Sequence, residues 1–190
     1  MGYSMSWLAA HGPAEAIRET LGLRVTGEQL EMPEAPIVGA ALGTGWYLVV
    51  ATSADHALVD DSSLERLSAN TDVIACSIEE HVMCSSAALW SGGSRIWSVM
   101  HDAQRAIDHL DAAGQLPPFF PEVRDQGLAQ QAAEGGAGAD VDLVFDVPLE
   151  TARRITGFRH DAGGEPARFD VLEPVPGSIL NRSRARWKFW

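Results

Sequence analysis

Residues 73–102 hold both cysteines of the chain, two of its histidines and two of its tryptophans, so this segment could do chemistry. The Gly-Gly pair at 92–93 suits a two-residue hairpin turn, whose central positions both need positive φ. A hairpin closed there places Cys84 opposite His101, with Cβ atoms about 5 Å apart. A cysteine and a histidine in that arrangement can form the thiolate–imidazolium pair of a nucleophilic enzyme. Cys84, His101 and Glu80, which share one predicted face, are therefore candidate catalytic residues.

A structural role for these residues explains the same pattern. Free cysteine is among the most buried residue types, so Cys84 beside a core histidine needs no catalytic function. The sequence shows no third residue that would orient His101 and no oxyanion motif. Glu79, His81 and Asp102 fall on the opposite predicted face of the hairpin and are candidate binding residues.

The histidines and cysteines lack the spacing of metal ligands. His81 and Cys84 are three residues apart on a predicted strand and therefore point to opposite faces. No Cys-x-x-Cys or His-x-x-x-His spacing occurs in the chain. We expect neither a metal site nor a cofactor.

The C-terminal segment 182–190, RSRARWKFW, alternates basic residues with small or aromatic ones. Such a pattern can bind an acidic surface, single-stranded nucleic acid or a lipid interface. The interpretation we favour is docking on the acidic body of the same chain or of a dimer partner, with Trp187 and Trp190 as apolar anchors.

The charge of the chain is unevenly distributed. Four of its 14 basic residues lie in the tail, so residues 1–181 carry 10 basic and 26 acidic side chains, a net charge of -16. An acidic body repels nucleic acid and anionic lipid, and it favours basic partners or simply solubility. No apolar run is long enough to cross a membrane. Two cysteines are too few for a disulfide scaffold, and we expect a cytoplasmic protein.

Hydrophobic patterning predicts an α+β fold with an antiparallel or mixed sheet. The run WYLVVA at 46–51 suits a buried strand, and the hairpin at about 73–102 joins the same sheet. Further strands are expected at 4–10, 141–147 and 169–172, and a proline-containing loop at 24–36. Helices packed on the sheet are expected at 13–21, 103–113 and 148–156. Further helical segments are expected at 63–67 and at about 122–133.

We expect residues 1–181 to form one domain. Its two strand-helix halves, about 1–114 and 141–176, would be joined by a helical and glycine-rich connection at 115–140. Segment 13–24 matches segment 148–159 without gaps at five of twelve positions, which suggests an internal duplication. The alternative is that proline at the start, glutamate in the first turn and glycine after the end are common to helices of this length.

Three functions are compatible with these observations. The first is a non-catalytic, inhibitor-like or immunity-like module whose acidic surface binds a basic protein partner. The second is a small thiol-dependent enzyme that uses Cys84 and His101. The third is a homo-oligomeric protein, for example a homodimer, that self-associates through a hairpin edge and the aromatic tail. The absence of motifs favours a protein that is not an enzyme.

Overall fold

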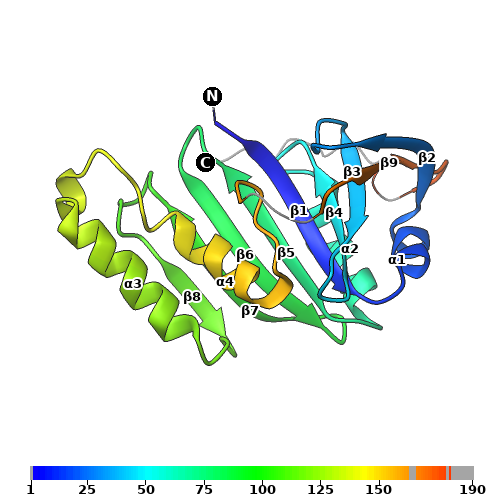
Figure 1. Cartoon of the computed structure of the whole chain (residues 1–190). Helices are drawn as coiled ribbons and strands as arrows, with labels where there is room; N and C mark the ends of the chain where they lie inside the picture. The colour runs from blue at the N-terminus through cyan, green and yellow to red at the C-terminus, as the bar shows by residue number, and fades with distance from the viewer. Residues whose placement is uncertain (1, 163–165, 179, 181–190) are drawn as a thin grey trace.

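The computed structural model describes residues 2–162, 166–178 and 180, and it consists of one nine-stranded antiparallel sheet with helices on both faces (Figure 1). The strand order is β2-β9-β3-β4-β1-β5-β6-β7-β8. The predicted α+β class with an antiparallel sheet is confirmed. The strands are β1 (Ser4–His11), β2 (Leu23–Leu30), β3 (Ile37–Ala41), β4 (Trp46–Ala51), β5 (Val73–Glu79), β6 (Cys84–Ser91), β7 (Ser94–Asp102), β8 (Asp111–Gly114) and β9 (Phe169–Pro174).

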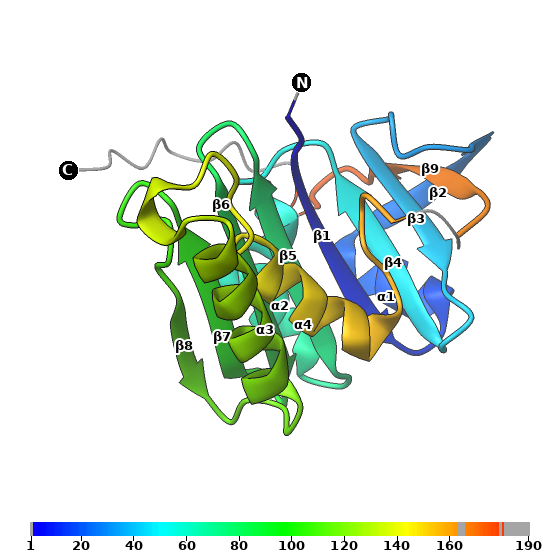
Figure 2. The same ribbon diagram turned by 60° about the vertical axis from the view of Figure 1, so that its left-hand side comes forward.

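The helices form a layer on each side of the sheet (Figure 2). They are α1 (Ala14–Leu21), α2 (Asp61–Ser68), α3 (Phe120–Ala133) and α4 (Asp146–Thr156), with short 3-10 turns η1 (Ala57–Val59) and η2 (Gly136–Gly138). The apolar side chains of α3 and α4 join one hydrophobic cluster, and those of α1 and α2 join a second. No helix in the described part of the chain is long and apolar enough to span a membrane.

The central strands explain how one sheet serves two cores. Successive side chains of β1 point to opposite faces, so Trp7 enters the cluster of α3 and α4 while Leu8 enters that of α1 and α2. Strand β4 is buried on both faces as well. A strand covered on both sides reads as a continuous apolar run, which is the pattern predicted for 46–51.

Helix ends follow the local chemistry of the sequence. Gly22 after α1 and Gly157 after α4 adopt φ angles of 67° and 83°, the left-handed conformation that ends a helix. The two helices of the sequence repeat belong to different hydrophobic clusters.

Two predicted elements have a different structure. Residues 103–113 were predicted as a helix, but they form a turn followed by the edge strand β8, which pairs with β7. Residues 24–36 were predicted as a loop, but 23–30 form edge strand β2, which pairs with β9. In both cases a partner strand, the preceding β7 for β8 and the distant β9 for β2, offers hydrogen bonds that local propensity does not show.

The predicted strand at 141–147 is also wrong. Its backbone is held by a side chain instead of a neighbouring strand. The amide of Gln131 donates to the carbonyl of Val141 at 3.0 Å and accepts from the N–H of Leu143 at 2.7 Å. With these backbone groups satisfied, no sheet partner is required, and α4 begins at Asp146.

Candidate binding face

The candidate site is built on segment 73–102, which forms two consecutive hairpins. Strand β5 ends at Glu79, a turn follows, and β6 begins at Cys84. Met83 in that turn has a φ of 50°, which breaks the single long strand expected before Trp90. The second turn is the predicted one, since Gly92 and Gly93 have φ angles of 58° and 74°.

A β-bulge changes the register of the second hairpin. Trp90 pairs with Arg95, as a two-residue turn at 92–93 requires, but Leu89 pairs with Trp97, which leaves Ile96 as the extra residue. A slip of one residue moves every later side chain to the other face. Ser85 therefore lies opposite His101, and Cys84 lies opposite Asp102. The predicted pairing of Cys84 with His101 is wrong for this reason.

His101 belongs to the core on the α4 side of the sheet. Its ring is fully buried, with Nδ1 at 2.7 Å from the carbonyl oxygen of His109 and Nε2 at 2.8 Å from Oδ2 of Asp142. The other oxygen of Asp142 accepts from the N–H of Phe145, just before α4. Both ring nitrogens are thus occupied: Nδ1 joins β7 to the turn before β8, and Nε2 joins β7 to the segment before α4.

The thiol of Cys84 lies between carboxylates. Burial raises its pKa most and the charge of Asp102 raises it next. Arg105 opposes this rise, and Glu79 adds the smallest increase. Burial also raises the pKa of Cys76 well above its ordinary value. The thiolate is the nucleophilic form of cysteine, and both environments disfavour it.

Glu80, the third catalytic candidate, supports the beginning of β1. One carboxylate oxygen accepts from the N–H of Tyr3 at 2.8 Å, and the other lies 3.4 Å from Nε2 of the buried His160. The ring of His160 also packs edge-on against the ring of Tyr3. These contacts give Glu80 a structural role at the start of β1.

We call the surface of β5–β8 that is opposite α4 the bare face. Helix α2 packs at one end of it, where Leu64 and Leu67 join the cluster of Val73 and Trp90. Directly opposed residues of antiparallel strands share a face. The register therefore gives four rows: Glu79, Cys84 and Asp102; Ser77, Ser86, Met100 and Asp111; Ala75, Ala88, Ser98 and Ala113; and Val73, Trp90 and Arg95.

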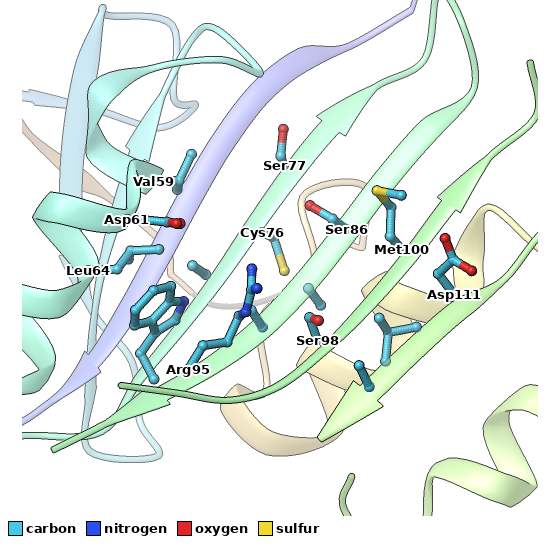
Figure 3. Close-up of a pocket in the computed structure, with 16 residues that line it drawn as sticks. Val59, Asp61, Leu64, Cys76, Ser77, Ser86, Arg95, Ser98, Met100 and Asp111 are labelled. Carbon is cyan, nitrogen blue, oxygen red and sulfur yellow. The ribbon is translucent and has the colours of Figure 1, made fainter. Parts of the chain in front are cut away.

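Small side chains in the two middle rows leave the bare face hollowed. The hollow has a volume of about 390 Å³ and lies between α2 and β8 (Figure 3). Its lining includes Leu64, Trp90, Arg95, Ser98 and Met100. A cavity of this size is in the range that holds small ligands or single side chains of a partner.

The end of the bare face remote from α2 is acidic. We call Glu79, Asp102 and Asp111 the acidic end. Hydrogen bonding from the Ser4 hydroxyl and from His81 lowers the pKa of Glu79, against the effect of burial, so this carboxylate is charged at neutral pH. The guanidinium of Arg105 lies 3.5 Å from Asp102 and 3.1 Å from Asp111. One arginine thus pairs with two of the three carboxylates.

The predicted binding residues are partly brought together. Glu79 and Asp102 flank Cys84 in one row, and Nδ1 of His81 lies 2.7 Å from the carboxylate of Glu79. Trp187 and Trp190 lie outside the described residues. The described residues contain no group of three or more histidine, cysteine or acidic side chains placed to hold a metal ion.

Sequence analysis missed Asp111, Asp61 and Arg95 as site residues. Asp111 fell within the predicted helix at 103–113, and Asp61 lay just before the predicted helix at 63–67. The turn at 92–93 places Arg95 opposite Trp90, but no feature of the sequence shows that a hollow lies beside this pair. The chain matches no protein-family model, no curated protein and no solved structure.

Proposed function

We propose that this protein is a non-catalytic binding module whose bare face receives a basic segment of a partner protein. The observation that carries the proposal is the acidic end, in which three strands present carboxylates beside an open hollow. The net charge of -16 on residues 1–181 would steer a basic partner toward the body before contact.

An extended basic segment suits the geometry of a sheet face. Successive rows on one face of a sheet are about 7 Å apart, because side chains on that face recur at every second residue. Basic side chains at alternate positions of an extended peptide have the same spacing. Such a segment, lying along β6 and β7, would place one cation near Asp111 and the next near Glu79 and Asp102.

The thiol-enzyme alternative has less support. Cys84 and His101 lie on opposite faces of the sheet, and both neighbours of Cys84 in its row are acidic. We also propose a cytoplasmic location, because free thiols such as those of Cys76 and Cys84 are typical of reducing compartments.

Self-association is the second candidate function, although not through the predicted hairpin edge, because β5 pairs with β1 and β7 pairs with β8. Strand β2 is an edge strand of eight residues, and Val25 on it is 46% exposed. An exposed edge of this kind can pair with the same edge of a second copy. Sedimentation analysis of the full chain, with Val25→Lys as the disrupting variant, tests for a homodimer built in this way.

The binding proposal is tested by titrating the full chain with acetyl-(Lys-Ala)4-amide in a calorimeter. We expect saturable binding that weakens as salt is raised, and none with acetyl-(Glu-Ala)4-amide. Asp111→Lys should weaken binding about threefold to tenfold. The matched control is Asp125→Lys on α3, because the two aspartates have similar side-chain exposures of 63% and 66%. Equal effects of the two substitutions would exclude the bare face as the binding site.

A further inference from the structure

The hollow contains a cationic and an anionic side chain that form no ion pair with any described residue. Arg95 extends into it from β7, and Asp61 faces it from the first turn of α2 (Figure 3). Neither side chain takes part in any ion pair of the described residues. They are therefore also too far apart to pair with each other. A ligand that paired with both side chains would need a negative group for Arg95 and a positive group for Asp61.

Arg95 is positioned by an aromatic ring. Its guanidinium carbon lies 5.9 Å from the centre of the Trp90 ring, a cation–π contact that leaves the N–H donors of the fork available. Trp90 itself is 5% exposed and is fixed in the cluster beneath α2. A guanidinium held in this way suits a carboxylate, which it can bind through two parallel hydrogen bonds.

The floor of the hollow adds hydroxyl groups. Ser86 and Ser98 lie in adjacent rows of β6 and β7, and neither side chain makes a hydrogen bond to another described residue. A free hydroxyl can donate to a carboxylate or accept from an ammonium group. The third serine of the lining, Ser77, donates to the carbonyl of Ala54.

An apolar wall lies alongside these polar groups. Val59, Leu64, Trp90 and Met100 line the hollow together with the small side chains of the floor. A wall of this kind accepts an aliphatic or aromatic side chain, whose burial adds to the affinity.

From these groups we infer that the hollow binds a free amino acid with a large apolar side chain. The carboxylate of the ligand would pair with Arg95 and the hydroxyl of Ser98, its ammonium group with Asp61, and its side chain would pack on Leu64 and Met100. This site shares Asp111 with the acidic end, but it goes beyond the proposed function, because its ligand is a small zwitterion and not a protein.

The test uses three probes that share a phenyl ring but differ in the charged groups they carry. They are L-phenylalanine, 3-phenylpropionate, which lacks the ammonium group, and 2-phenylethylamine, which lacks the carboxylate. Saturation-transfer NMR on the full chain gives the three affinities. We expect phenylalanine to bind at least tenfold more tightly than either analogue. Arg95→Gln should remove the advantage over the amine, and Asp61→Asn should remove the advantage over the acid.

Arg66→Gln, at an exposed position of α2, is the matched control and should leave all three affinities unchanged. Three results would overturn the inference: no binding of phenylalanine, equal affinity for the three probes, or insensitivity to both Arg95→Gln and Asp61→Asn. The outcome is independent of the proposed function, since binding of acetyl-(Lys-Ala)4-amide is measured without the amino acid.

Discussion

Nε2 of His101 lies 2.8 Å from the carboxylate of Asp142, and the side chains of the two residues are 0% and 7% exposed. This pair connects β7 to the segment that begins α4, across 41 residues of sequence. Because Nδ1 of His101 faces a carbonyl oxygen as well, both ring nitrogens already have partners within the protein. The pair is a structural link in the core.

Removal of one partner of this pair should be costly. His101→Ala leaves the buried carboxylate of Asp142 uncompensated, and we expect a loss of about 3–5 kcal/mol in the free energy of unfolding. Urea denaturation followed by circular dichroism measures the change. His81→Ala removes an exposed histidine from Glu79 and should cost less than about 1 kcal/mol. Similar losses in the two variants would contradict the structural role of His101.

The bulge at Ile96 can be tested by disulfide formation. Opposed residues of antiparallel strands have Cα atoms about 4.5–5.5 Å apart, within the range that a disulfide spans. Asp102→Cys should therefore form a disulfide with Cys84 under mild oxidation, detected by mass spectrometry. His101→Cys should not, although the register predicted from sequence would pair it with Cys84. Met100→Cys controls for unspecific oxidation, and a disulfide in the His101→Cys variant alone would disprove the observed register.

The environment of Cys84 predicts slow alkylation. Its raised pKa keeps the thiolate fraction low, so the iodoacetamide rate at neutral pH should fall below that of a free cysteine. The double variant Glu79→Gln with Asp102→Asn removes two of the charges that raise the pKa, and its rate should increase. Cys76 is buried and should react only after unfolding. Rapid labelling of Cys84 near pH 7 would restore the thiol-enzyme hypothesis.

Glu79 should contribute to the pH dependence of stability. Its pKa is lowered in the folded protein, chiefly by the hydrogen bond from the Ser4 hydroxyl. The folded state therefore binds this proton less readily, so the contribution is complete above the unfolded-state pKa and is lost as the pH falls through the folded-state pKa. Glu79→Gln should lower stability by at most about 1 kcal/mol at pH 7.

In acid, the same substitution should have no effect. Denaturation of wild type and the Glu79→Gln variant between pH 7 and pH 3 measures the difference. A difference that grows toward low pH would have the wrong sign.

Local chemistry made part of the fold predictable. The helix stops at Gly22 and Gly157 and the turn at Gly92-Gly93 depend on conformations that glycine favours, and each is present as expected. The register of β7 depends on one extra residue, Ile96, whose type gives no sign of a bulge. That single residue separated Cys84 from His101.

The bare face shows the limit of prediction more generally. Glu79 and Asp102 were predicted to share a face and they do, because two shifts of one residue cancel: one in the turn before Cys84 and one at the bulge. Asp111 reached the same surface only because β8 pairs with β7, which is a contact between segments and not a property of either. The hollow likewise exists because α2 covers one end of the face and leaves the remainder open.

The measurement that tests the central claim most directly is an NMR titration of the full chain with acetyl-(Lys-Ala)4-amide, read as shifts of assigned backbone amides. If the bare face is the binding surface, the largest shifts will fall in β6, β7 and β8, around Ser86, Met100 and Asp111. The amides of α3 and α4, on the other side of the sheet, will stay unchanged. Shifts confined to α3 and α4, or none on β6–β8 at saturation, would contradict the claim.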